Sequence, residues 1–304
     1  MPFHRPTVLP GFKTFAILLP IVVLAMVSAG RCMAGDYLFH VDGDRLCLND
    51  RSDVKIIGLR CSNALISDEA TDALIAQLDN YRTAGINTVS VYFMGSRFSD
   101  IKGYRPDGTL DPVYAARMGR IIEAADRRGM IVLVGCLYWS TSKAKEDLDH
   151  WKQEDADRAV ANTVRWLIAH DYRNVFVDPD NEGMAHRETG WSIASMIDAA
   201  HAVDPTIPVV YNSSQTPPDN ADFYIHHSPI VEGRAWVQAE GSPPKTPGGY
   251  WGSYSKKDEV YNYINIGVYL DEMRESQIKQ SDTDLEKHNG YILASTWLQC
   301  VAPH

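Results

Sequence analysis

Apolar residues follow two alternating patterns from about residue 55 onward. Short, nearly continuous apolar runs are followed by longer stretches in which apolar residues recur every three or four positions. A continuous run is typical of a strand buried on both faces, and the longer period is typical of an amphipathic helix. The predicted strands are 55–62, 87–93, 130–137, 174–177, 208–211, 222–226, 235–239 and 291–298, and the predicted helices are 68–84, 112–128, 154–170, 191–203 and part of 258–287.

Strand and helix in repeated alternation predict a parallel sheet, and eight strands favour a closed barrel over an open sheet. The predicted fold class is therefore α/β, a (β/α)8 TIM barrel. Residues 37–50 add a small N-terminal β-hairpin, expected to plug the barrel floor. The second half is degenerate because its crossovers are short, and only 301–304 follow the last strand, so the last helix is lacking or the sequence is a fragment.

The N-terminal segment has the layout of a signal peptide. His4, Arg5 and Lys13 precede an almost wholly apolar run over residues 14–29. Cleavage before Gly35 would leave one domain, 35–304, and a secreted or periplasmic protein. Retention as an anchor is the alternative, although a stable span usually needs about 20 apolar residues. We predict no membrane association beyond this segment.

Composition limits the partners. Asp and Glu number 39 against 29 Lys and Arg, for a formal net charge of −10. An acidic surface argues against nucleic acid or anionic lipid as a partner, whereas a neutral carbohydrate remains compatible with it. The roughly 270 residues after the signal segment fit one barrel domain. The oligomeric state stays open.

The cysteines predict neither a zinc site nor a redox motif, because no CxxC pair or Cys/His zinc spacing occurs. Cys61 and Cys300 are the pair expected to approach if the first and last barrel strands are neighbours. A disulfide between them and buried free thiols are the two alternatives.

Two glutamates carry the candidate chemistry. Glu182 and Glu240 each close an apolar run, and each is followed by glycine. A carboxylate at the end of a buried strand is costly without a function or a partner. A single glutamate at a strand end is more often a helix cap or an ion-pair partner than a catalyst. The placement of two such glutamates favours a catalytic role in cleaving a glycosidic bond. One carboxyl protonates the leaving oxygen while the other attacks the anomeric carbon.

Active sites of such barrels lie at the C-terminal ends of the strands. The other strand ends carry polar residues that can bond sugar hydroxyls and aromatic residues that can cover a sugar ring. Several of these residues could instead have a purely structural role. The tryptophans could belong to the core, His226 and His227 could be buried hydrogen-bonding groups, and residues 243–251 could form a rigid loop. The candidate substrate-binding residues are Arg60, Asn63, Tyr92, Tyr138, Trp139, Asn181, Asn212, Tyr224, His226, Trp251 and Trp297.

This layout resembles the retaining glycoside hydrolases of the cellulase superfamily (clan A). In that superfamily an Asn-Glu pair ends strand four and a glutamate ends strand seven. The resemblance, over roughly 37–300, implies Glu182 as acid/base, Glu240 as nucleophile and Trp297 as the aromatic platform. It also implies that Asn181 bonds the 2-hydroxyl of the reacting sugar.

Two positions depart from the superfamily pattern. Gly183 stands where proline is common, and Ser90 stands where strand two usually carries arginine. We expect Arg60, from strand one, to supply the missing positive charge near the nucleophile. Asp178 is expected to be a structural cap of the loop, and to help keep Glu182 neutral if it points inward together with Asp180.

The predicted function is an exported retaining glycoside hydrolase for β-linked oligo- or polysaccharide degradation, requiring no cofactor and no metal. His226, with Tyr224, would orient Glu240 or hold a hydroxyl. One alternative is a catalytically silent barrel that binds glycans. A weaker one is a metal-dependent hydrolase using His226, His227 and Asp178.

Overall fold

The computed structural model describes residue 1 and the ranges 38–49, 52–83, 85–95, 100–139, 142–225, 231–241 and 289–293. The predicted signal segment, apart from Met1, lies outside these residues. So do the predicted helix within 258–287 and everything after residue 293.

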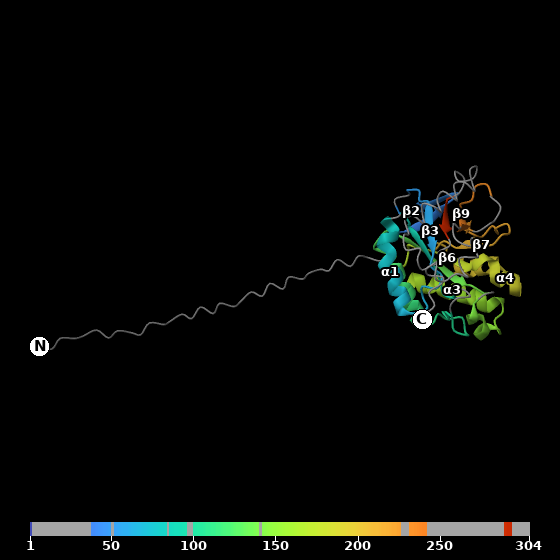
Figure 1. Cartoon of the computed structure of the whole chain (residues 1–304), viewed down its shortest axis with the longest axis horizontal. Helices are drawn as coiled ribbons and strands as arrows, with labels where there is room; N and C mark the ends of the chain where they lie inside the picture. The colour runs from blue at the N-terminus through green and yellow to red at the C-terminus, as the bar shows by residue number, and fades with distance from the viewer. Residues whose placement is uncertain are drawn as a thin grey trace, which may run out of the picture. The chain divides into compact units, whose positions relative to one another are not determined.

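Eight parallel strands form one sheet in the order β6-β5-β4-β3-β10-β9-β8-β7. The ring closes between its two outermost strands, because Val177 bridges to Val209 in parallel and its N–H donates to Pro208 O at 2.8 Å. The fold is thus a parallel TIM barrel (Figure 1). The strands are β3 (Ile56–Arg60), β4 (Thr88–Tyr92), β5 (Ile131–Leu137), β6 (Val175–Asp180), β7 (Val210–Asn212), β8 (Phe223–Ile225), β9 (Trp236–Gly241) and β10 (Gly290–Leu293).

Helices lie outside the strands, as Figure 1 shows for α1, α3 and α4. Local sequence fixes where some of them begin: the Asp111 side chain accepts the Val113 N–H at the start of α2, next to a proline, and Ser192 caps α5 in the same way. Helix α1 packs beside α2, and α3 beside α5. The helices are α1 (Asp68–Thr83), α2 (Pro112–Asp126), α3 (Gln153–Ala169), α4 (Met184–Thr189) and α5 (Ile193–His201).

These bounds confirm the four predicted helices that fall in described residues, each to within about two positions. Three short elements were not predicted: the 3-10 helices η1 (Lys143–Leu148) and η2 (Asn181–Gly183), and α4. The described crossover between β7 and β8, residues 213–222, contains no helix. The remainder of the second half lies outside the described residues.

A hairpin of β1 (Phe39–Asp42) and β2 (Arg45–Leu48) lies at the N-terminal end of the barrel. Its Phe39 N–H donates to the carbonyl of Arg173, two residues before β6 begins. The Phe39 ring lies 5.5 Å from that of Phe176 in β6 and 6.1 Å from that of Phe223 in β8. Burying an aromatic ring of this size contributes about 1.5–3 kcal/mol, so this contact fixes both the hairpin and the inward face of β8.

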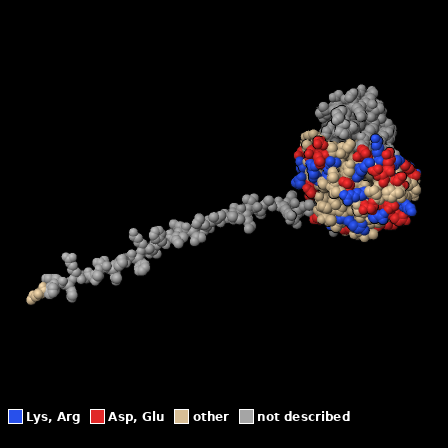
Figure 2. Space-filling model, turned by 90° about the horizontal axis from the view of Figure 1, so that it is seen from below, with Lys and Arg blue, Asp and Glu red and all other residues tan. Residues whose placement is uncertain are grey.

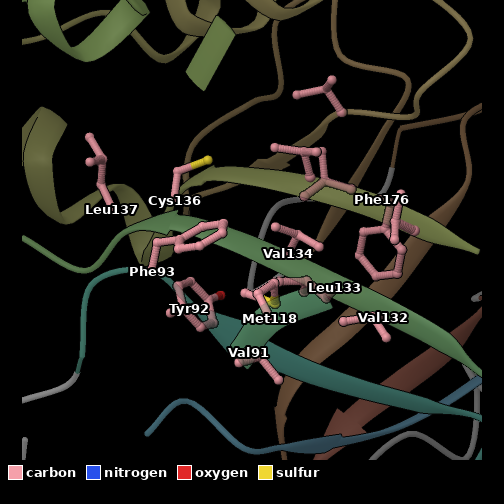
Figure 3. Packing of buried hydrophobic residues seen from close by; sticks show 14 of the residues in the cluster. Val91, Tyr92, Phe93, Met118, Val132, Leu133, Val134, Cys136, Leu137 and Phe176 are labelled. Carbon is pink, nitrogen blue, oxygen red and sulfur yellow. The ribbon is translucent and has the colours of Figure 1, made fainter. Parts of the chain in front are cut away.

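The core between strands and helices is mainly apolar. All seven residues of β5 are buried, as expected for a strand covered on both faces. Figure 3 shows buried apolar side chains of β4, β5 and β6, among them Val91, Val134 and Phe176.

Three cysteines of the described chain, Cys47, Cys61 and Cys136, are buried free thiols. Burial raises the pKa of the Cys136 thiol to about 12, so it is unreactive at neutral pH. The choice between a Cys61–Cys300 disulfide and buried free thiols depends on the placement of Cys300. Cys300 lies outside the described residues.

The surface seen in Figure 2 mixes acidic and basic side chains. Ion pairs such as Arg128 with Asp79, at 2.8 Å, join α2 to α1. Exposed pairs of this kind contribute at most about 1 kcal/mol each. No helix within the described ranges combines the length and apolarity needed to cross a lipid bilayer.

Candidate active site

The chain leaves β6 through a turn of unusual backbone conformation. Glu182 has φ 55° and Gly183 has φ 64°, so two successive residues adopt the left-handed region. This conformation costs a residue with a side chain about 1–2 kcal/mol, and such strain concentrates at functional sites. It also explains one departure from the superfamily pattern, because a proline ring would hold φ near −65°. Glycine is favoured over proline at position 183 because it adopts this conformation without strain.

We expect Gly183→Ala to destabilise the protein more than Gly190→Ala. Both glycines have positive φ, but a Cβ at Gly183 would stand 3.0 Å from Ser213 Oγ, whereas a Cβ at Gly190 would meet open space. The left-handed backbone costs each variant about 1 kcal/mol, and the contact with Ser213 adds to that cost only at position 183. Urea unfolding of both variants measures the difference. Equal losses would show that the turn tolerates the extra atom.

Arg60 joins β3 to the candidate acid. Its side chain is 2% exposed, and its Nη1 lies 3.2 Å from Glu182 Oε1. Asn181 Nδ2 donates to the same oxygen at 3.2 Å. Two donors therefore fix one carboxylate oxygen, and the guanidinium stabilises the ionised form of Glu182.

The position of Arg60 accounts for the second departure. Arg60 stands opposite Ser90 in the ladder between β3 and β4. An arginine on the first barrel strand thus places its charge beside the position where the superfamily has one on the second strand. The structure pairs this charge with Glu182. The expected proximity of Arg60 to Glu240 stays a prediction, because the side chain of Glu240 lies outside the described residues.

A buried hydrogen-bond network fills the barrel next to this pair. Asp178 Oδ2 accepts from the Tyr92 hydroxyl and from Asn212 Nδ2, both at 2.6 Å. Asn181 Oδ1 lies 3.0 Å from the same hydroxyl and 3.4 Å from Asn212 Nδ2. Side chains from β4, β6 and β7 thus converge on one point, which ties Asn181, and through it Glu182, to three strands.

Burial raises the pKa of Asp178 to about 6, against the hydrogen bonds from Tyr92 and Asn212 that favour its ionised form. Its Oδ1 also accepts the Asp180 N–H at 3.2 Å, a local contact of the kind expected of a loop cap. The network across the barrel was not anticipated. Alternation could have indicated it, because Phe176, Asp178 and Asp180 share one face of β6.

Asp180 caps α4. Its two carboxylate oxygens accept the N–H groups of Ala185 at 2.8 Å and His186 at 2.9 Å. Burial raises the pKa of Asp180 to about 7, while these two N–H groups favour the ionised form. The cap attaches the helix that follows Glu182 to the end of β6, so the role of Asp180 is structural.

These two aspartates predict a pH-dependent stability. The pKa of each aspartate is about 4 in the unfolded chain and is raised in the folded protein. The folded state therefore binds more protons than the unfolded state between pH 4 and 7. The stabilisation is complete below pH 4 and is lost as pH rises through 6 and 7, with a slope of up to about 1.4 kcal/mol per pH unit for each group. Asp178→Asn and Asp180→Asn should each flatten this slope in urea unfolding at stepped pH. Slopes equal to that of the unsubstituted protein would contradict the assignment.

Three other predicted residues are buried, and one of them, Tyr138, contacts the network. The ring of Tyr138 meets that of Tyr92 edge to face, with centroids 5.5 Å apart. Asn63 is buried just after β3. Trp139 packs 4.6 Å from Trp191, which matches its alternative as a core residue.

Tyr224 does not take part in the buried hydrogen-bond network. Its hydroxyl accepts the Val231 N–H at 2.7 Å, and its ring stacks on Trp236. Neighbouring strand residues point to opposite faces, and Phe223 faces the barrel floor. Tyr224 therefore faces outward, away from the position expected of it.

Glu240 lies near the C-terminal end of β9, where the neighbouring Gly241 is in register with Leu293 of β10. In the closed ring β9 is three strands from β6, so Glu182 and Glu240 stand at the same end of the barrel on separated strands. The side chain of Glu240 and all of His226, Trp251 and Trp297 lie outside the described residues. His227 does as well, and the described side chains contain no group of three metal-ligating residues.

No protein-family model matches the chain, and no curated protein matches it. Solved glycoside hydrolases are similar in structure. A family 5 enzyme from Bacteroides vulgatus has a TM-score of 0.55 at 12% identity and covers 88% of this chain and 64% of its own, so this chain spans less than two thirds of that relative. A family 5 mannosidase from Rhizomucor miehei has a TM-score of 0.55 at 10% identity, with 86% of each chain covered. A β-glucanase from Saccharophagus degradans has a TM-score of 0.52 at 14% identity, covering 85% of this chain and 84% of its own. At these identities the similarity establishes a shared fold.

Proposed function

We propose that this protein is a retaining glycoside hydrolase that cleaves β-linked oligo- or polysaccharides, with Glu182 as acid/base and Glu240 as nucleophile. The observation that carries the proposal is the hydrogen-bonded group of Arg60, Asn181 and Glu182 at the C-terminal end of the barrel. A barrel of this fold is shared with glycan-cleaving enzymes, among them a β-glucanase and a mannosidase.

In the first step, a carboxylate oxygen of Glu240 attacks the anomeric carbon while the bond to the glycosidic oxygen breaks. Glu182 transfers its proton to that oxygen, and the leaving sugar departs as an alcohol. In the second step, Glu182, now a carboxylate, takes a proton from water, and the water oxygen displaces Glu240. Glu182 is thereby reprotonated, and the product keeps the configuration of the substrate.

Two hydrogen bonds hold the side chain of Glu182 in place. Its Oε1 accepts from both Arg60 and Asn181. Arg60 also favours the carboxylate that forms after the first transfer. Asn181 positions Glu182 through its amide nitrogen, in addition to the contact with the sugar 2-hydroxyl that the resemblance implies.

A mechanism-based 2-deoxy-2-fluoro glycoside tests the proposal after a screen of aryl glycosides and polysaccharides has found a substrate. We expect the enzyme to gain the mass of one fluoroglycosyl group, which peptide mapping places on Glu240. Glu240→Gln should gain no label. Hydrolysis with the label on another residue would reject the assignment, and glycan binding without hydrolysis of any substrate would favour the silent barrel.

A further inference from the structure

A cavity of about 230 Å³ lies outside the barrel, behind the turn that carries Glu182. Its walls come from α4, the start of α5, β7 and the segment that follows β7. Asn212 reaches into the barrel to Asp178, so its neighbour Tyr211 points to the opposite face of β7 and lines the cavity. The other lining residues used below are His186, Ser192, Ile193, Gln215 and Thr216.

Tyr211 brings a hydroxyl group to the wall of the cavity. The residue is 5% exposed, and its hydroxyl has no hydrogen-bond partner among the described residues. A phenolic hydroxyl in an otherwise buried side chain normally finds a partner. A ligand hydroxyl in the cavity would supply it.

His186 adds a defined acceptor. Its Nδ1 lies 2.7 Å from the carbonyl oxygen of Trp191. Because a carbonyl only accepts, Nδ1 carries the proton and Nε2 is left as the acceptor of the neutral ring. Ser192, Gln215 and Thr216 contribute hydroxyl and amide groups that can donate and accept.

The lining determines the class of ligand. None of the residues around the cavity is Asp, Glu, Lys or Arg. An ionic ligand would therefore meet no opposite charge, whereas a ring carrying several hydroxyls would meet donors, acceptors and the apolar side chain of Ile193. The volume restricts the ligand to about one sugar unit.

We propose that this cavity binds one neutral monosaccharide unit, at a site separate from the mouth of the barrel. The choice of a sugar over other neutral polyols rests on the proposed function. The cavity touches the turn of the candidate acid: a Cβ at Gly183 would lie 3.7 Å from Ile193 Cδ1, and the His186 N–H donates to Asp180. A bound sugar thus stabilises the segment that positions Glu182.

The test follows the Ile193 δ-methyl signal by NMR in the full-length protein during titration with glucose, mannose, galactose or xylose. At least one sugar should shift this signal saturably, with a Kd of the order of 1–10 mM. The methyl of Ile121, buried on α2, serves as the control and should not move. No saturable shift of Ile193 with any of the four sugars overturns the proposal.

Two variants locate the contact. Tyr211→Phe should weaken binding about fivefold by removing one hydrogen bond. Gln215→Trp fills the cavity from an exposed position that folding tolerates, and should abolish the shift. Unchanged affinity in both variants overturns the proposal. Titration with an oligosaccharide, with and without its terminal sugar, identifies the source of the ligand. If the Ile193 signal shifts only when the terminal sugar is present, the ligand is the end of a glycan chain. If a free monosaccharide shifts the signal, the ligand is a separate molecule.

The outcomes stay distinguishable from those for the active site. Titration of the Glu240→Gln variant needs no turnover. Saturable Ile193 shifts without hydrolysis of any glycan would reject the proposed function and retain this site. Hydrolysis of a glycan without any shift of the Ile193 signal would retain the proposed function and reject this site.

Discussion

Glu182→Gln is expected to lower kcat/KM on a β-linked glycan by about 10²- to 10⁴-fold, the range that a positioned general acid contributes. Glutamine keeps the shape of the side chain and can still accept from Arg60 and Asn181 through its oxygen. It cannot deliver a proton. Initial rates on a glycan found by the screen measure the effect.

The same variant should lose less activity on an aryl glycoside whose phenol leaves without protonation, because only the acid's contribution is then bypassed. Glu188→Gln, on α4 in an exposed pair with Lys145, is the matched control and should retain full activity. A Glu182→Gln enzyme with near-normal activity on the glycan would reject Glu182 as the acid.

Arg60→Met is expected to lower the free energy of unfolding by about 3–5 kcal/mol. The guanidinium is almost fully buried, and its removal leaves Glu182 and Asp178 without their nearby positive charge. A buried charge that has lost its partner costs this much because neither water nor a counter-ion replaces it. Urea unfolding near pH 7, where both carboxyls are mostly ionised in water, measures the loss.

Arg128→Met is the matched control, because Arg128 pairs with Asp79 at the exposed surface. It should cost at most about 1 kcal/mol. Arg60→Lys keeps the charge but loses the two-pronged geometry, so its loss should lie between the two. An Arg60→Met loss no greater than that of Arg128→Met would show that the buried ion pair is not a stabilising element.

The positions of the strands along the chain could be predicted from the sequence because strands buried on both faces leave continuous apolar runs. Where the side chains become polar, the prediction stopped early: strand four was expected to end at Val177, whereas β6 runs to Asp180. Those last residues stay in the strand because Asp178 bonds across the barrel and Asp180 caps α4. Neither contact is local in sequence.

Other differences have the same origin. Helix α4 has six residues and follows a glycine, so no side-chain cap signal precedes it; its cap comes from Asp180, four residues before the helix. The inward face of β8 is set by the contact of Phe223 with Phe39, which is 184 positions away in sequence. Without that contact, alternation alone could not say that Tyr224 faces outward.

The central claim is that Glu182 and Glu240 flank one glycosidic bond, and the separation of their carboxyl groups tests it most directly. A crystal structure of the Glu182→Gln variant with a bound oligosaccharide would give the distance between the two side-chain carboxyl and amide carbons. The account predicts about 5–5.5 Å, with the glycosidic oxygen between the two groups. Side chains that point into different cavities, or a separation well beyond 10 Å, would contradict it.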